Sequence, residues 1–318
     1  MFEPEERIRR GYLDTPAGQV FTLDNGAGEP LILLHQTPRS SSMFVPLMRL
    51  LAPRYRTIAL DMLGYGDSPA PPAASDGSVD ARELGRNVIH ALDALGIDRA
   101  HVFGFHTGAF AAAVAAAEAP GRIGALVLGG YPYIADAADF ERFFEGQETL
   151  LTLNRPATDS LDGSHAVSMW MKAYSEVQKW WLHSVGTPTD PNASSLLRHP
   201  SPHRPAHSFL TGEELAFIRR WTADFYRIRS TAEIYKSMLG GDARSVLSGI
   251  SAPTLHLEAD SPYESPFCRR GEEVATLVPD CRAVVVPQSD DNMMEFNPQA
   301  VASIVEEFLA SHAFSAEG

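Results

Sequence analysis

Cysteine is scarce in this sequence: its 318 residues include only two, Cys268 and Cys281. The pair has no Cys-x-x-Cys spacing, which argues against a zinc ribbon and against a fold held by disulfides. A chain with so few thiols fits a reducing compartment, so we expect a cytoplasmic protein.

Long hydrophobic runs are also missing. No stretch approaches the roughly 20 apolar residues that a membrane span needs. The acidic residues 1–6 lack the apolar segment of a signal peptide. With 44% hydrophobic and 21% charged residues, the chain instead has the composition of a globular protein, and we expect no membrane contact.

Basic residues are outnumbered, with 26 Lys and Arg against 40 Asp and Glu, for a net charge of −14. Such a surface repels the phosphates of nucleic acids and anionic lipids. The sequence has no Gly-rich loop of the kind that binds dinucleotides or phosphates. We therefore expect a neutral or weakly polar small molecule as partner, no cofactor, no metal, and a monomer or homodimer.

Short apolar runs recur near both ends of the chain, and helical patterns lie between most of them. Residues 31–34 and 125–128 are typical of strands buried on both faces of a parallel sheet. Residues 107–119 and 298–309 are typical of helices, and residues 8–23 of a hairpin. This alternation predicts an α/β fold with a doubly wound, mostly parallel sheet.

The alternation fails between residues 131 and 247, a stretch too long to be a simple loop. Helical patterns recur inside it, at residues 166–183 and 212–239. Because the insert lies between two strands of the sheet, we predict a helical cap over a core of residues 1–130 and 248–318. A separate domain is the alternative.

Three motifs resemble those of the α/β-hydrolase superfamily and occur in its order. Residues 33–38, Leu-Leu-His-Gln-Thr-Pro, resemble its turn after an early strand, and residues 60–68 its Asp-x-x-Gly-x-Gly-x-Ser segment. Residues 104–108, Gly-Phe-His-Thr-Gly, occupy its nucleophile elbow. The resemblance implies an α/β-hydrolase fold with an inserted cap, like the epoxide hydrolase and dehalogenase branch, and a cofactor-free hydrolase, lyase or isomerase.

The elbow residue is His106, where the superfamily carries Ser, Cys or Asp. The position that usually holds the catalytic histidine falls instead on Asp291, with Asp290 as the nearest competitor. A carboxylate beside an imidazole raises its pKa and fixes its tautomer. We therefore predict that His106 is a general acid or base oriented by Asp291, without a covalent intermediate.

The third position of the superfamily, an acid after the strand at residues 254–257, is predicted to be Asp260, with Glu258 as the alternative. Each of these assignments has an alternative in which the residue has no catalytic role. His106 would then belong to a dead site, Asp291 would be a solvated loop carboxylate, and Asp260 would cap a helix.

The same resemblance places further residues at the site. The backbone N–H groups of Thr107 and of Gln36 or Thr37 are candidates for an oxyanion hole. His35 is expected to make a structural hydrogen bond behind that turn. In the cap, His165 and Trp170 either belong to the start of a helix or face the substrate.

These residues predict a cofactor-free enzyme that acts on a small apolar carbonyl or hydroxylated compound between sheet and cap. Two reaction types fit: hydrolysis by activated water, and proton transfer of the C–C lyase, decarboxylase, isomerase or cyclase kind. A catalytically dead ligand-binding or sensor protein is the alternative from another class. A metal-dependent hydrolase using His35, His106 and Asp291 is a third interpretation.

Overall fold

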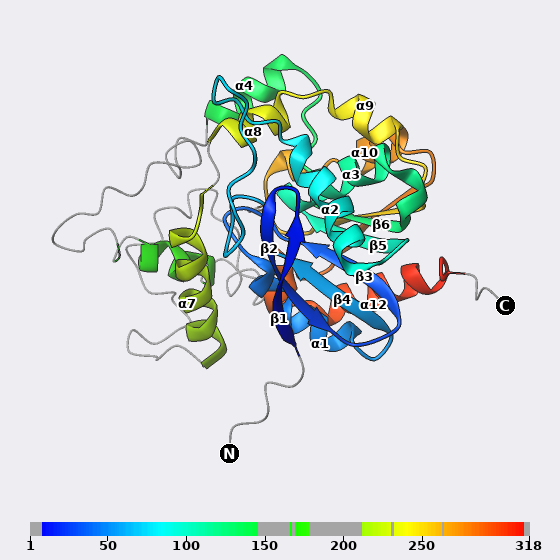
Figure 1. The fold of residues 1–318 in the computed structure, drawn as a ribbon. Coiled ribbons are helices and arrows are strands. Elements are labelled where there is room, and N and C mark those ends of the chain that lie inside the picture. Colours follow the sequence, from blue (N-terminus) through cyan, green and yellow to red (C-terminus); the bar gives the residue numbers. More distant parts are fainter. Residues whose placement is uncertain are drawn as a thin grey trace.

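The computed structural model describes residues 8–145, 166, 169–177, 212–229, 232–262 and 264–314. Their centre is an eight-stranded sheet in the order β1-β2-β4-β3-β5-β6-β7-β8 (Figure 1). The strands are β1 (Arg9–Thr15), β2 (Gly18–Asn25), β3 (Glu29–Leu34), β4 (Tyr55–Leu60), β5 (Ala100–Phe105), β6 (Ile123–Gly129), β7 (Thr254–Ala259) and β8 (Cys281–Val286).

The hairpin β1–β2 is antiparallel and joins the sheet through an antiparallel pairing of β2 with β4. All pairings from β4 to β8 are parallel. Every residue of β5 and β6 is buried. A strand covered on both faces has no polar side, which explains why the sequence shows continuous apolar runs there rather than alternation.

Helices cover both faces of this sheet (Figure 1). Buried residues of α2 (Arg82–Leu95) and α3 (Thr107–Glu118) belong to one hydrophobic cluster, and those of α1 (Val45–Leu51) and α12 (Pro298–Ala310) belong to the cluster on the other face. The predicted doubly wound sheet is thus confirmed. The other described helices of the core are η1 (Ser41–Phe44), η2 (Pro120–Arg122), α9 (Ala243–Ser248), η4 (Pro266–Cys268), α10 (Gly271–Leu277) and α11 (Met293–Phe296).

Within the insert, the structure describes α4 (Ala137–Glu145), α7 (Gly212–Tyr226) and α8 (Ala232–Leu239). The span 212–239 predicted as helical thus contains two helices. Residues 169–177 are also helical; Ala173 and Val177 pack with α7 in a small apolar cluster of their own. None of the described helices is long and apolar enough to cross a membrane.

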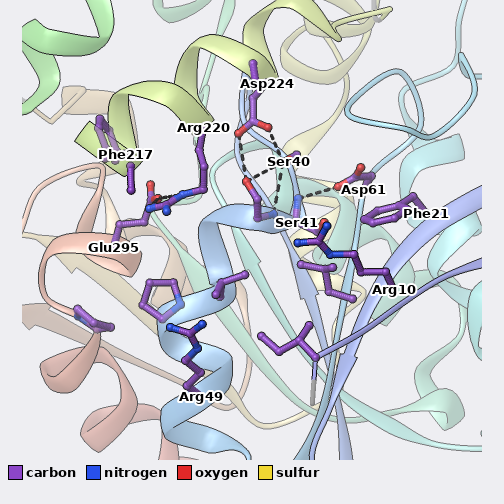
Figure 2. Close-up of a pocket in the computed structure, with 18 of the residues that line it drawn as sticks. Arg10, Phe21, Ser40, Ser41, Arg49, Asp61, Phe217, Arg220, Asp224 and Glu295 are labelled. Atoms are coloured by element: carbon purple, nitrogen blue, oxygen red, sulfur yellow. Dashed lines mark hydrogen bonds and ion pairs between the residues drawn. The ribbon is translucent and has the colours of Figure 1, made fainter. Parts of the chain in front are cut away.

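A cavity of about 1080 Å³ lies between α7 and the core (Figure 2). Its walls include Phe217 and Arg220 of α7, and Ser41 and Phe21 of the core. His106 is not among the described residues that line it. This cavity is therefore separate from the elbow.

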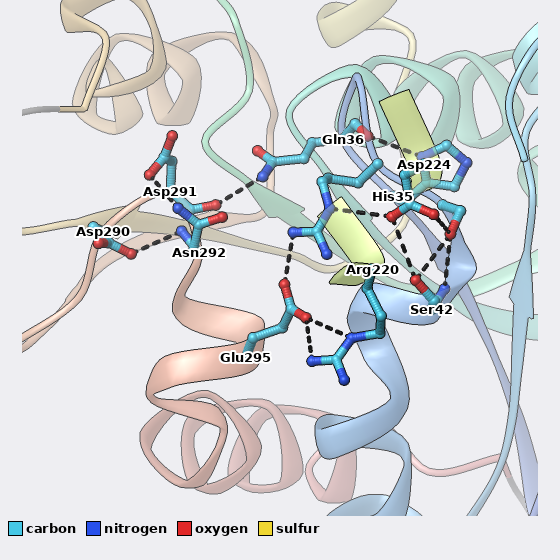
Figure 3. Close-up of polar contacts among 11 residues, drawn as sticks. His35, Gln36, Ser42, Arg220, Asp224, Asp290, Asp291, Asn292 and Glu295 are labelled. Atoms are coloured by element: carbon cyan, nitrogen blue, oxygen red, sulfur yellow. Dashed lines mark hydrogen bonds and ion pairs between the residues drawn. The ribbon is translucent and has the colours of Figure 1, made fainter. Parts of the chain in front are cut away.

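Buried charges tie α7 to the core beside this cavity (Figures 2 and 3). Arg39, which is fully buried, donates from Nε to Asp224 Oδ2 of α7 (3.2 Å) and from Nη1 to Glu295 Oε2 of α11 (2.6 Å). Arg220 of α7 donates to the other oxygen of Glu295 at 2.8 Å. Ser40 Oγ donates to Asp224 Oδ1 at 2.6 Å. Each carboxylate in this group thus faces a guanidinium.

Candidate active site

His106 occupies the sharp turn between β5 and α3, with φ 48° and ψ −109°. A positive φ is uncommon outside glycine and costs backbone energy. The turn is held by a bond from His106 N–H to Gly129 C=O at 2.8 Å. A Cβ at Gly104 or Gly108 would lie about 2 Å from backbone oxygens, 2.0 Å from Gly108 O and 2.1 Å from Leu34 O respectively. Strand and helix can therefore approach only if both positions are glycine.

The imidazole of His106 is fixed by three contacts. Its Nε2 lies 3.2 Å from Oε2 of Glu264, and the exposed fractions of the two side chains are 17% and 3%. Its ring stacks on Phe105 at 4.3 Å between centroids. Gly130, with φ 52°, lies against the ring: a Cβ there would be 2.6 Å from Nε2. The ring therefore has little freedom to turn.

The pKa of His106 reflects two opposing effects, burial and acidic neighbours. Burial alone lowers the pKa of His106, but the charge and hydrogen bond of Glu264, followed by the charge of Asp291, raise this pKa above its usual value. Burial alone raises the pKa of Glu264, but the imidazole and the Ser265 N–H, which donates to Oε1 at 2.8 Å, lower it below its usual value. An ionised carboxylate can only accept, so Nε2 carries the proton and, in neutral His106, Nδ1 carries the lone pair.

Asp291 lies in the turn before α11 (Figure 3). Gln36 Nε2 donates to its backbone carbonyl at 2.9 Å, and Asn292 Nδ2 donates to its Oδ1 at 2.9 Å. Asp290 is buried, and its Oδ1 accepts the Asn292 N–H at 2.8 Å. Burial and the charge of Asp291 raise the pKa of Asp290 well above its usual value. Asp291 thus acts on His106 through its charge, whereas Asp290 contributes a buried carboxyl group.

Glu264 is thus a hydrogen-bonded partner of His106 that was not predicted from the sequence. Asp260 lies in the same loop after β7. Its carboxylate accepts the N–H groups of Gln288 (2.7 Å) and Ser289 (2.9 Å), which holds the turn after β8.

Glu258, the alternative to Asp260, is also bound to the backbone, because it accepts the Gly271 N–H. A signal for Glu264 was present in the sequence, since an acid in this loop was expected. Spacing from the strand does not indicate which acid of the loop reaches the elbow.

His35 has a structural environment. The Met62 N–H donates to its Nε2 at 2.9 Å, so Nδ1 carries the proton and donates to the Gln36 carbonyl, also at 2.9 Å. Complete burial lowers the pKa of His35 to about 4. A neutral, doubly bonded imidazole supports the turn that carries Gln36 and Thr37.

Four hydroxyl groups form a chain beside the elbow. Thr37 Oγ1 donates to Tyr65 OH (2.7 Å) and lies 3.0 Å from Thr107 Oγ1, which lies 3.1 Å from the hydroxyl of Tyr235 in α8. Each hydroxyl has one proton. Because Thr37 gives its proton to Tyr65, Thr107 must donate to Thr37, and Tyr235 to Thr107. Both threonine protons are used, and neither Tyr65 nor Tyr235 was predicted from the sequence.

The backbone N–H of Thr107 remains suited to an oxyanion. Thr107 is the first residue of α3, so its N–H has no acceptor within the helix. The positive end of the α3 dipole also points at the elbow. Of the predicted cap residues, Trp170 lies in the helical residues 169–177 with 37% of its surface exposed, and His165 lies outside the described residues.

Cys268 is the sulfur-containing neighbour of this site. Its Sγ, a ring nitrogen of His106 and a carboxylate oxygen of Glu264 all lie within 4.8 Å of one another. Burial, followed by the charge of Glu264, raises the pKa of the Cys268 thiol well above its usual value. A raised pKa makes a thiol a poorer nucleophile at neutral pH, which argues against Cys268 as a replacement for the missing elbow nucleophile.

Comparison with known proteins points to one fold family. The family described as alpha/beta hydrolase fold matches residues 29–170, somewhat less than half of the chain. Haloalkane dehalogenase 2 of Mycobacterium bovis (strain ATCC BAA-935 / AF2122/97) is 30% identical over 118 residues, which are 37% of this chain and 40% of that protein. A 2-hydroxy-6-oxononadienedioate/2-hydroxy-6-oxononatrienedioate hydrolase of Paraburkholderia xenovorans (strain LB400) is 38% identical over 112 residues, 34% of this chain and 38% of that protein.

The similarity in sequence thus spans about two fifths of these curated relatives. The similarity in structure is broader. A hydrolase from Pseudomonas aeruginosa PA01 matches with a TM-score of 0.66 and 23% identity, over 95% of this chain and 98% of that one. The chain therefore has the α/β-hydrolase fold, as predicted.

Proposed function

We propose that this protein is an enzyme that hydrolyses a small neutral carbonyl compound by general acid–base catalysis, with water as the nucleophile. The observation that carries the proposal is the 3.2 Å hydrogen bond between His106, on the strained elbow, and the buried carboxylate of Glu264. The hydrolases among its relatives support the class of reaction.

Three groups share the chemistry of this reaction. Glu264 holds the Nε2 proton, so Nδ1 of His106 takes a proton from water while the water oxygen bonds to the carbonyl carbon. The backbone N–H of Thr107 stabilises the resulting oxyanion. When the intermediate collapses, the bond to the leaving group breaks and His106 returns the proton to that group. No bond to the protein forms, which suits an elbow without Ser, Cys or Asp.

A second reaction uses the same groups. His106 would remove a proton from carbon next to the carbonyl, and the Thr107 N–H would stabilise the enolate. This is the first step of lyase, isomerase and cyclase chemistry. The absence of a covalent nucleophile at the elbow favours it.

The charges around His106 favour a neutral substrate. Glu264, Asp291 and Glu258 all act on the Cys268 thiol as negative charges. An anionic substrate would meet this acidic excess and be repelled. The relative from Paraburkholderia xenovorans is named for dioate substrates, which are anions. We therefore expect this chain to differ from it in substrate charge.

The reaction type is tested with labelled water. The protein is incubated with a panel of neutral esters and ketones in deuterium oxide or in water labelled with heavy oxygen, and the compounds are examined by mass spectrometry. Heavy oxygen in the product shows hydrolysis, whereas deuterium at carbon without oxygen incorporation shows proton transfer. Stoichiometric binding without incorporation of either label would show a ligand-binding protein and contradict the proposal.

His106→Ala tests the assigned base. We expect kcat to fall by more than about a hundredfold, the usual value of general acid–base catalysis, and added imidazole to restore part of it. His90→Ala, which changes a histidine of α2, is the matched control. Nearly full activity in His106→Ala would reject the assignment.

A further inference from the structure

Three different donor atoms converge at the elbow, and the proposed reaction uses only two of the residues that carry them. His106 Nε2 and Glu264 Oε2 lie 3.2 Å apart, and Cys268 Sγ lies within 4.8 Å of a ring nitrogen of His106 and of a carboxylate oxygen of Glu264. They come from three segments: the elbow, the loop after β7, and η4. Glu264 and Cys268 are buried, and His106 is partly exposed.

This donor set suits zinc. Imidazole nitrogen, carboxylate oxygen and thiolate sulfur are the usual ligands of Zn²⁺. Bonds of about 2.0–2.3 Å in a tetrahedron separate neighbouring ligand atoms by about 3.3–3.8 Å. His106 Nε2 and Glu264 Oε2, 3.2 Å apart, are already close to this range, and Cys268 completes a group whose donor atoms lie within 4.8 Å of one another. The charge of Asp291, close enough to act on both His106 and Cys268, adds attraction for a dication.

We propose that His106, Glu264 and Cys268 form a Zn²⁺ site whose occupancy switches off the acid–base chemistry; this inference rests on the proposed function of His106. Zinc takes the Nε2 lone pair, so the ring proton moves to Nδ1. Cys268 loses its thiol proton to solvent and binds as thiolate. Nδ1 is then protonated and cannot accept a proton from water, so bound zinc inhibits the enzyme.

Binding is measured on the whole protein with Co²⁺ as a coloured probe and with Zn²⁺ as its competitor. We expect one ion per chain and a thiolate-to-cobalt absorption band. Loss even of an outer-shell partner weakens metal binding by about tenfold or more, so Cys268→Ser should weaken Zn²⁺ binding by more than about tenfold and remove the band. Cys281→Ser changes the other thiol, in β8, and is the matched control.

Three results would overturn the site: no stoichiometric binding of Zn²⁺, equal binding by Cys268→Ser, or loss of the band in Cys281→Ser. The effect on rate is taken as the ratio of rates with and without Zn²⁺ within each variant. We expect strong inhibition of the wild type and the Cys281 variant, and weaker inhibition of the Cys268 variant; zinc activation would refute the switch. If zinc fails to bind but His106→Ala is inactive, only this inference fails. If zinc binds but His106→Ala remains active, the proposed function fails.

Discussion

His35 and His106 lie at the carboxyl ends of the paired strands β3 and β5, yet their environments are opposite. His35 is bonded on both sides to backbone groups, and burial lowers its pKa to about 4. His106 faces the carboxylate of Glu264, and its pKa is raised. Burial alone lowers the pKa of an imidazole, whereas a carboxylate that stabilises the charged form raises it.

The same contrast extends to the surrounding charges. Near His35, the buried guanidinium of Arg39 is balanced by Asp224 and Glu295. Near His106, the carboxylates of Glu264 and Asp291 act on the imidazole itself and raise its pKa. The first arrangement fastens α7 to the core, whereas the second supplies a site for a proton.

Asp224→Ala disrupts the balanced ion pairs of Arg39 near His35. Of the changes considered, it should have the largest effect on stability. It leaves the fully buried Arg39 facing one carboxylate fewer, and breaking a buried pair costs about 3–5 kcal/mol of unfolding free energy. Urea unfolding measures this loss. Asp67→Ala is the control, because the ion pair of Asp67 with Arg227, just after α7, is exposed, with side-chain exposures of 38% and 50%, and should cost less than about 1 kcal/mol. Equal losses in both variants would contradict the structural role of the network.

Glu264→Gln tests the second environment in the comparison, the carboxylates around His106. Without the Glu264 charge, the pKa of His106 falls. Because the base form acts, the rising limb of kcat/KM against pH should move to lower pH. Its maximum should decrease by about tenfold or more, since a hydrogen bond to a charged group contributes about 1.5–3 kcal/mol. The imidazole pKa is measured by NMR and the limb by kinetics. An unchanged pKa, or a larger shift in Asp291→Asn, would show that Glu264 is not the principal partner.

His256 adds a third buried histidine to the comparison. Neither of its ring nitrogens has a hydrogen-bond partner among the described residues, and burial lowers its pKa to about 4. His256→Met removes these unsatisfied atoms and should raise the unfolding free energy by about 1 kcal/mol at pH 7.

The gain from His256→Met should be larger at pH 5. Between pH 6.5 and about 4, the unfolded chain protonates His256 and the folded chain does not, so wild-type stability falls with falling pH over this window. Urea unfolding at both values checks this. His35→Met, which removes two hydrogen bonds, should instead destabilise; the same sign for both variants would contradict the distinction.

The features that could be predicted from the sequence are those that depend on local residue patterns. The apolar runs of β5 and β6, and glycines at 104 and 108 around the elbow, require only short-range sterics and two-sided burial. The α/β fold follows from these features. The position of His106 on a strained turn follows from the same glycines.

The partners of His106 depend on contacts between distant segments. Glu264 reaches the elbow from a loop after β7, and Tyr235 reaches Thr107 from a helix of the insert. No spacing in the sequence encodes either approach. Asp260 fits the expected position after the strand equally well, yet its carboxylate accepts N–H groups of the turn after β8.

Gly130 has a consequence for how this site can vary. A Cβ at this position would lie 2.5 Å from Cδ2 and 2.6 Å from Nε2 of His106. Any other residue at 130 would expel the imidazole from its contact with Glu264. A shorter residue at the elbow would leave that space empty. Histidine at position 106 therefore requires glycine at position 130, so the two positions cannot be substituted independently.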